Sequence, residues 1–314
     1  MFSLEIPADK RSFRTKASPF GVIASILVLC SVTVAESPYG PTMKLCDLAN
    51  AKVTESSGIA MSWSNPGVFW THNDSGDDAV LYAFDIRGRD LGGFKLRGIR
   101  AVDWEDIATF KYRGKNYILV GDIGDNDKRR AYCQLVLAED PRINLTKPDE
   151  GLKVEQVIRF TYEDGPRDCE ALAVDPTLGK IYLVSKVLTE GGAAGIYELD
   201  IPAQQSSRRY VARKIGSLDI LGITGMDISA NGRKVVLVTY MYAFEYLRTA
   251  NESWAQAFGA KPDIIPMPGR RQGEAICYSL NAKALVVTSE SGRDTATPVW
   301  LITPFQSGKS GTSP

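Results

Sequence analysis

The chain has 314 residues, and its 37 lysines and arginines are balanced by 37 aspartates and glutamates. A chain without a basic excess cannot neutralise many phosphates, so we expect no nucleic-acid partner. Its single histidine, His72, also excludes a zinc site built from several histidines.

The first 35 residues have the layout of a secretory signal peptide. Four basic residues precede an apolar run from Phe20 to Ala35, which ends in small residues before Glu36. This run is short for a membrane span, and a retained membrane anchor is the alternative. We therefore expect residues 1–35 to be cleaved, residues 36–42 to form a linker, and the protein to be secreted or periplasmic without a stable membrane span.

Four cysteines follow the predicted signal peptide: Cys46, Cys133, Cys169 and Cys277. An exported protein could pair them, and four cysteines allow three connectivities. They are widely spaced in a chain large enough to bury its own core, which favours free, buried thiols.

Short runs of β-branched and aromatic residues recur between Gly, Asp, Asn and Pro, which predicts an all-β fold with antiparallel hairpins. A short segment of similar sequence, which we call the marker, recurs five times along the chain, and each copy is followed by two such runs. The five copies are residues 56–60, 104–108, 169–173, 223–227 and 273–277. The first four units end in a further strand-like run. The fifth lacks one, and the run 43–53 stands unassigned before the first unit.

Five such units predict a five-bladed β-propeller over residues 43–305, closed by an N-terminal outer strand. A six-bladed propeller with one degenerate blade is the alternative, whereas the fivefold recurrence disfavours a β-sandwich. We expect residues 306–314 to form a disordered tail and the protein to be a monomer.

The marker places one oxygen-donating side chain of each unit beside the central channel, because the first strand of a propeller blade lines it. These side chains are Ser57, Glu105, Glu170, Thr224 and Glu274. Calcium takes six to eight oxygen ligands, and without a cation the converging carboxylates would repel one another. Magnesium prefers fewer protein ligands and zinc prefers nitrogen or sulfur, so the pattern predicts bound Ca²⁺. The alternative is that these acids only solvate a water-filled channel.

The same residues resemble the calcium-activated nucleotidases, the apyrase family, whose members are five-bladed propellers with one calcium in the channel. Glu55-Ser56-Ser57, Trp104–Ala108 and Glu274-Ala275-Ile276 are similar to short markers of that family, and Thr224 stands where the family has a serine. The resemblance spans roughly residues 43–305 and implies a nucleotidase with one calcium ligand from each blade. The longer nucleotide-contacting segments of the family are not evident, so the resemblance implies the metal more directly than the substrate.

The loops at the mouth of the channel carry further charged residues. We expect Asp74 or Asp125 to position an attacking water, and nearby arginines to clamp the oxyanions of a small phosphorylated or carboxylated ligand. These arginines are Arg100, Arg129, Arg167 and Arg271. Asp103, two positions before a predicted ligand, is expected at the mouth as well. His72 is a weaker candidate base, and Asp, Asn and Gly are also ordinary hairpin-turn residues.

These patterns predict a secreted calcium-dependent phosphohydrolase that acts on a nucleotide or another phosphate ester. The first alternative is a non-catalytic propeller with a structural calcium and a sugar or protein ligand. The second is a glycosidase, whose chemistry needs two carboxylates about 5–9.5 Å apart. Asp106 has no acidic counterpart in the other units, and the pattern does not explain it.

Overall fold

The structure, a computed structural model, describes residues 38–143, 151–270, 272–291 and 295–305. The predicted signal peptide, the predicted C-terminal tail and Arg271 lie outside the described residues. No helix among the described residues is long and apolar enough to cross a membrane.

The described strands form four-stranded antiparallel meanders, which are the blades of a β-propeller. Blade 1 contains β2 (Ser56–Met61), β3 (Val68–Asn73), β4 (Val80–Asp85) and β5 (Asp90–Lys95). Blade 2 contains β6 (Trp104–Tyr112), β7 (Lys115–Asp122), β8 (Cys133–Glu139) and β9 (Val154–Tyr162). Blade 3 contains β10 (Cys169–Asp175), β11 (Lys180–Ser185), β12 (Ala194–Asp200) and β13 (Tyr210–Leu218).

The last two blades depart slightly from this plan. Blade 4 contains β14 (Ile223–Ile228), β15 (Lys234–Thr239), β16 (Tyr242–Leu247) and β17 (Asp263–Pro266). A short helix, α1 (Trp254–Ala257), precedes β17 and is capped by Ser253. Blade 5 contains β18 (Ile276–Tyr278), β19 (Leu285–Val287), β20 (Pro298–Ile302) and the N-terminal strand β1 (Met43–Asp47).

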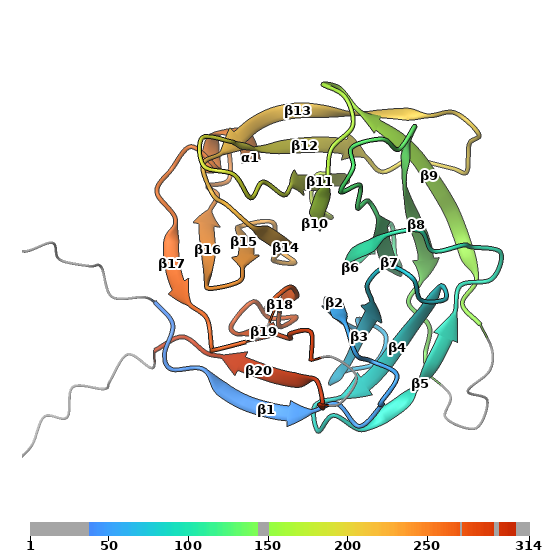
Figure 1. Ribbon diagram of the computed structural model, residues 1–314, viewed down its shortest axis with the longest axis vertical. Helices are drawn as coiled ribbons and strands as arrows, with labels where there is room; N and C mark the ends of the chain where they lie inside the picture. Colours follow the sequence, from blue (N-terminus) through green and yellow to red (C-terminus); the bar gives the residue numbers. More distant parts are fainter. Residues whose placement is uncertain (1–37, 144–150, 271, 292–294, 306–314) are drawn as a thin grey trace, which may run out of the picture. The chain divides into compact units, whose positions relative to one another are not determined.

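The first strand of each blade lies at the centre of the ring and the last at its rim (Figure 1). Blades 2 and 3 are joined further at the rim, where β9 and β13 pair in parallel over Phe160–Tyr162 and Tyr210–Ala212. The all-β propeller that the repeated marker predicts is therefore confirmed by the strand order and pairing.

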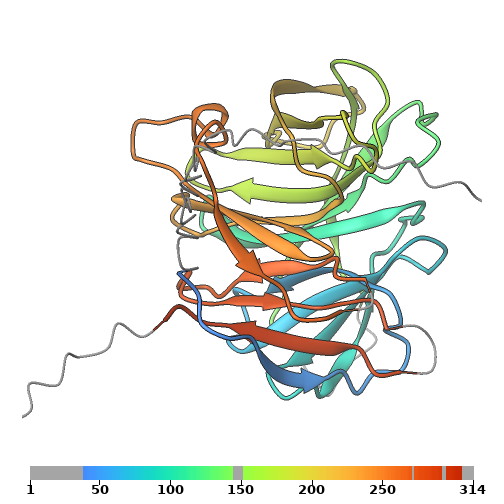
Figure 2. The ribbon, with the colours of Figure 1, turned by 60° about the vertical axis from the view of Figure 1, so that its left-hand side comes forward.

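Apolar side chains fill the space between neighbouring blades. Figure 2 shows the strands of the blades from the side. Between blades 1 and 2, Trp70 of β3 and Trp104 of β6 belong to one buried cluster. Because each blade is covered on both faces, a strand such as β10 is buried at every position. This two-sided burial explains why the sequence shows continuous apolar runs as well as alternating ones. The four cysteines are free, and three of them are buried.

The N-terminal strand completes the C-terminal blade, as predicted. β1 pairs antiparallel with β20, from Met43 opposite Leu301 to Asp47 opposite Pro298. Just before β1, Tyr39 Oη donates a hydrogen bond of 2.6 Å to Glu245 Oε1 of blade 4. The ring is therefore closed by backbone pairing and by a buried side-chain contact.

Candidate metal centre

Four of the five predicted ligands lie at β-bulges in the first strands of their blades. The pairing register shifts at the position of Ser57, and it shifts in the same way at Glu105, Glu170 and Thr224. A bulge leaves its extra residue unpaired and turns that side chain out of the regular alternation. In blade 5, Glu274 precedes β18 instead. At the recurring marker, one residue of each blade is therefore left out of the regular strand pairing, either at a bulge in the first strand or in the loop before it.

The two predicted hydroxyl ligands bridge neighbouring blades. Ser57 Oγ donates to the main-chain oxygen of Glu105 at 2.7 Å, and Thr224 Oγ1 donates to that of Gly273 at 3.0 Å. A hydroxyl that donates its single proton keeps its lone pairs, so both oxygens are still able to coordinate a cation.

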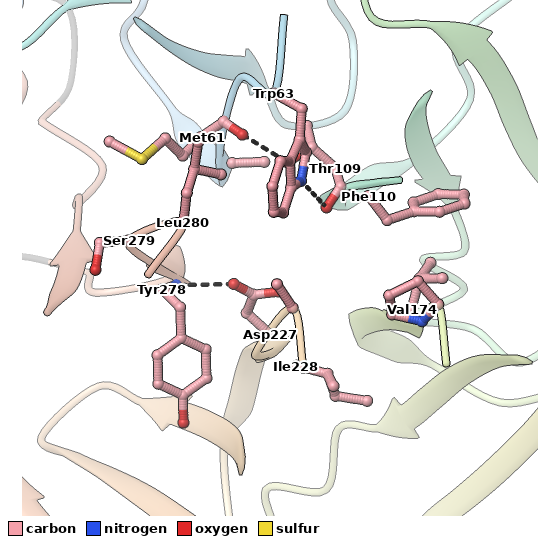
Figure 3. Close-up of a pocket in the computed structure, with 13 residues that line it drawn as sticks. Met61, Trp63, Thr109, Phe110, Val174, Asp227, Ile228, Tyr278, Ser279 and Leu280 are labelled. Atoms are coloured by element: carbon pink, nitrogen blue, oxygen red, sulfur yellow. Dashed lines mark hydrogen bonds between the residues drawn. The ribbon is translucent and has the colours of Figure 1, made fainter. Parts of the chain in front are cut away.

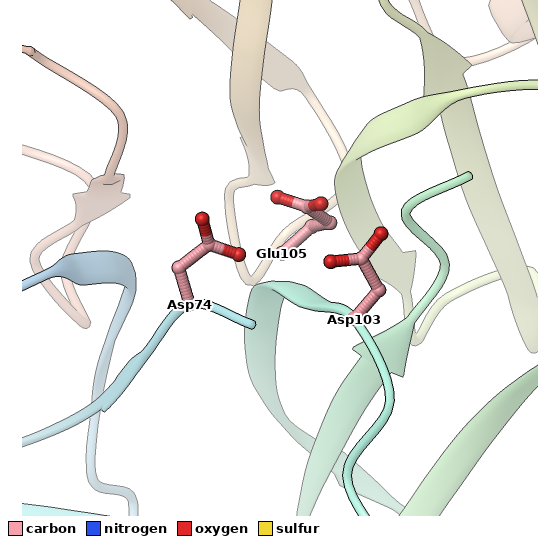
Figure 4. Close-up of side chains that lie close together, drawn as sticks. All are labelled: Asp74, Asp103 and Glu105. Carbon is pink, nitrogen blue, oxygen red and sulfur yellow. The ribbon is translucent and has the colours of Figure 1, made fainter. Parts of the chain in front are cut away.

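Three carboxylates converge at the mouth of the channel (Figure 4). One oxygen from each of Asp74, Asp103 and Glu105 lies within 4.8 Å of the other two. The main chain of Gly124 packs against them, since a Cβ there would lie 2.1 Å from Glu105 Oε1 and 2.4 Å from Asp103 Oδ2. The structure therefore brings together a predicted ligand, a predicted catalytic acid and Asp103. We call these three residues the acidic cluster.

Burial and repulsion both act on the acidic cluster. Burial, followed by the charges of Glu170 and Asp74, raises the pKa of Glu105 well above its usual value. Burial and the charge of Asp74 raise the pKa of Asp103 to about 6. The raised pKa values of Glu105 and Asp103 show that the carboxylates of the acidic cluster lack enough positive charge nearby. Such an excess of carboxylates favours a bound cation.

The other two predicted carboxylate ligands have partners of their own. Lys186 Nζ lies 2.5 Å from Glu170 Oε1, and burial raises the pKa of Glu170 to about 7 although Lys186 lowers it. Burial and a hydrogen-bonded carboxyl neighbour, Glu290, raise the pKa of Glu274 to about 9. Two carboxyl groups in contact share a proton, because the repulsion between two carboxylates keeps one of the groups protonated.

The predicted catalytic residue Asp125 shapes its own loop. Its two carboxylate oxygens accept hydrogen bonds from the main-chain amides of Arg129 and Arg130, at 2.8 and 2.9 Å. Its own amide donates to Asp168 Oδ1 at 3.1 Å. Asp125 therefore holds the β7–β8 loop in shape, and it is outside the acidic cluster.

The predicted substrate-binding arginines occupy different surroundings. Arg129 is exposed and lies 3.5 Å from Asp127, and Arg100 is exposed as well. Arg167 pairs with Asp164 at 2.9 Å and donates to Tyr197 Oη at 3.0 Å. Arg271 lies outside the described residues. Arg167 is thus engaged within its own blade, whereas Arg100 and Arg129 extend toward solvent.

His72 belongs to the packed interior. It is fully buried, its Nδ1 lies 2.9 Å from the main-chain oxygen of Asn73, and its ring meets Trp104 edge-on at 5.6 Å. Burial lowers its pKa to about 4, so the imidazole stays neutral near pH 7. This environment favours a packing role over that of a catalytic base.

Asp106, which the sequence pattern leaves unexplained, spans three blades. Its Oδ2 accepts hydrogen bonds from the amides of Leu172 in β10 and Met226 in β14, at 2.8 and 3.0 Å. Its Oδ1 accepts from the amide of Ile107 at 2.8 Å. A single buried carboxylate thus accepts hydrogen bonds from the first strands of blades 2, 3 and 4.

The opposite end of the channel holds a small cavity lined by polar as well as apolar side chains (Figure 3). A cavity of about 20 Å³, large enough for about one water, is lined by a segment from each blade. The lining includes Met61, Phe110, Val174, Ile228 and Tyr278. Asp227 accepts a hydrogen bond from the amide of Tyr278 at 2.8 Å (Figure 3).

Lys186 is a charged residue beside the predicted ligands that the sequence reasoning missed. It follows β11, and its amide donates to the main-chain oxygen of Asp168, just as Asp74 donates to Glu55 and Glu290 to Gln272. Asp74, Lys186 and Glu290, which follow the second strands of their blades, therefore occupy equivalent places. A comparison of these positions across the units could have found it, but the first-strand marker drew attention elsewhere.

No family model matches the chain, and no curated protein matches it. Among solved structures, the chain is similar to the Dos1 propeller, with 11% identity over 79% of this chain and 68% of that one and a TM-score of 0.39. It is similar to a chain of the nidogen/laminin complex, with 12% identity, coverage of 76% and 73%, and a TM-score of 0.44. It is also similar to hydrazine synthase of Kuenenia stuttgartiensis, with 12% identity, coverage of 81% and 64%, and a TM-score of 0.40. The resemblance to the calcium-activated nucleotidases stays a prediction.

Proposed function

We propose that this propeller binds a divalent cation, calcium, at the acidic mouth of its channel. The observation that carries the proposal is the acidic cluster, in which oxygens of Asp74, Asp103 and Glu105 lie within 4.8 Å of one another. The hydroxyl oxygens of Ser57 and Thr224, freed at the bulges, and the carboxylates of Glu170 and Glu274 are the further donors expected from the sequence.

The chemistry of these donors favours calcium over other metals. All of them are oxygens, whereas zinc prefers nitrogen or sulfur ligands. They come from several blades and from loops as well as strands, which suits the flexible coordination of calcium better than the strict octahedron of magnesium. The raised pKa of Glu105 supports a bound cation without distinguishing the metal, because any cation would relieve the repulsion that contributes to the shift.

We further propose that this site hydrolyses a phosphate ester or nucleotide. A bound calcium would polarise a phosphoryl oxygen. Asp74 is the member of the acidic cluster that we propose as the base, because it is partly exposed and its carboxylate can orient a water and take its proton. The charges of Lys186 and Arg130 reach the cluster, since Lys186 lowers the pKa of Asp74 and Arg130 that of Asp103. Of these two cations, Arg130 is paired with Asp122, so Lys186 is the one better placed to meet a substrate oxyanion than the exposed Arg100 and Arg129.

A second candidate function, a non-catalytic propeller with a structural calcium, is favoured by a separate observation. The carboxylate of Asp125 and the guanidinium of Arg167 are engaged within their own loops. Under this alternative the cation only ties the blades together, and the open mouth receives a sugar or protein without turning it over.

Calcium titration of the metal-depleted protein by calorimetry tests the binding. The wild type is expected to bind Ca²⁺, and Glu105→Gln to lose that binding. Glu139→Gln, at the end of β8 in an exposed ion pair with Lys115, is the matched control and should bind like the wild type. Equal calcium binding by wild type and Glu105→Gln would contradict the proposal.

Phosphate release from a panel of nucleotides and phosphate esters, with calcium and with chelator, then separates the two functions. Calcium-dependent release that Asp74→Asn abolishes supports the hydrolase. Binding of calcium without release from any member of the panel supports the structural role. For either function, we propose that the protein is exported from the cell and is a monomer.

A further inference from the structure

Lys186 places an ammonium group directly on the ring of predicted ligands. Its side chain is only 11% exposed, and its Nζ lies 2.5 Å from Glu170 Oε1. The ammonium also lies 5.6 Å from the centre of the Tyr240 ring, which follows β15 in the next blade. Among the described residues, no other lysine or arginine forms an ion pair with one of the three predicted glutamate ligands.

The charge of Lys186 acts on several blades at once. It lowers the pKa of Asp74 in blade 1, of Glu170 in blade 3, and of Glu290 in blade 5. The neighbouring cations are committed elsewhere. Arg130 pairs with Asp122 at 2.7 Å, and Arg270 donates to the main-chain oxygens of Thr288 and Thr239. Lys186 is therefore the counter-ion of the ring in this structure.

A lysine ammonium is a compact point charge on a flexible stem of four carbons. It can approach a carboxylate as a bound metal ion would, and it can also withdraw without disturbing the backbone. Two cations close together in a partly buried site repel each other strongly. By linkage, whatever free energy Lys186 gains from Glu170 must oppose the binding of a second cation there.

We propose that Lys186 is a tethered competitor of the metal, and that Glu170 becomes a ligand only when a divalent cation displaces the ammonium. This inference rests on the cation binding proposed above, and it explains how the site would select divalent over monovalent cations. A sodium or potassium ion that displaced Lys186 would replace one unit charge with another, and would gain nothing electrostatically. A divalent ion brings one more charge to the acidic cluster, so the lysine sets a threshold that favours Ca²⁺ over monovalent ions.

The test is calcium titration of metal-depleted wild type, Lys186→Met and Lys186→Arg, with thermal unfolding in chelator measured in parallel. Lys186→Met is expected to bind Ca²⁺ more tightly, by on the order of tenfold, because a repelling charge has been removed. Lys186→Arg keeps the charge and should stay within a few-fold of the wild type. In chelator, Lys186→Met should melt at a lower temperature, because Glu170 has lost its counter-ion.

Two further variants make the result specific. Lys115→Met removes an exposed lysine paired with Glu139 and should change neither calcium affinity nor its selectivity. In a Glu170→Gln background, Lys186→Met should change calcium affinity far less, because the carboxylate for which the two cations compete is gone.

Calcium affinity in Lys186→Met that is equal to or weaker than in the wild type would overturn this inference while leaving the cation site standing. Failure of both the wild type and Lys186→Met to take up calcium would overturn the proposed function, and this inference with it.

Discussion

Asp106 Oδ2 accepts a hydrogen bond from the main-chain amide of Met226 at 3.0 Å, although the two residues are 120 positions apart in the chain. The same oxygen accepts from the amide of Leu172 at 2.8 Å. The first strands of blades 2, 3 and 4 are thus tied together beneath the acidic mouth by one side chain. The geometry of the proposed metal centre depends on this contact, because the blades that carry Glu105, Glu170 and Thr224 are the three it joins.

Asp106→Ala is expected to lower the free energy of unfolding by about 3–5 kcal/mol, because it leaves buried amides of two blades without an acceptor. Urea unfolding measures the loss. Asp200→Asn, at a mostly exposed carboxylate 3.6 Å from Lys180, is the control and should stay within about 0.5 kcal/mol of the wild type. A loss below 1 kcal/mol for Asp106→Ala would contradict the bridging role.

In chelator, the protein should become less stable as the pH rises from about 6 to about 9. Burial raises the pKa of Glu170 to about 7 and that of Glu274 to about 9, from values near 4.5 in the unfolded chain. Between its unfolded and its folded pKa, each of these groups binds more protons in the folded state than in the unfolded state. The stability that these protons confer is therefore lost as the pH rises through each folded pKa. Melting temperatures measured across this range test the sign.

Saturating calcium should flatten or reverse that pH dependence, since the cation replaces the protons as the partner of the carboxylates. Melting temperatures that rise steadily with pH in chelator would be inconsistent with the raised pKa values.

Gly124→Ala should weaken calcium binding on the order of tenfold or more, because a Cβ would enter the space of Glu105 Oε1 and Asp103 Oδ2. Calorimetric titration with calcium measures the effect. Gly216→Ala is the control, since a Cβ there meets Ile196 at an ordinary 3.7 Å. Wild-type calcium affinity in Gly124→Ala would show that the acidic cluster is not where the metal binds.

Tyr39→Phe should lower the free energy of unfolding by about 1–3 kcal/mol, because Glu245 loses one of its buried donors. Tyr39 and Tyr278 both donate to Glu245 Oε1, at 2.6 and 2.8 Å, and Lys234 lies 3.1 Å from Oε2. A double-mutant cycle with Tyr278→Phe should show coupling between the two tyrosines. Tyr242→Phe, at a more exposed tyrosine of β16, is the control. Additive effects would mean that the N-terminal closure and blade 5 act independently.

The sequence alone was enough to predict the propeller, because each blade is a local meander whose strands follow one another in the chain. The spacing of Ser57, Glu105, Glu170 and Thr224 could be recognised for the same reason, since each of them lies at a bulge in the first strand of its own unit. The closing strand β1 was recognisable as the run that the fifth unit lacked.

Only the tertiary structure decided which charged groups meet. Asp74, Asp103 and Glu105 come from two blades, Lys186 and Glu170 from a third, and Asp106 reaches two blades beyond its own. Asp125 and Arg167 looked equally suitable in the sequence, yet their side chains satisfy their own loops. Local periodicity determines strands because it acts over a few residues, whereas the pairing of charges across a ring depends on contacts between residues far apart in the chain.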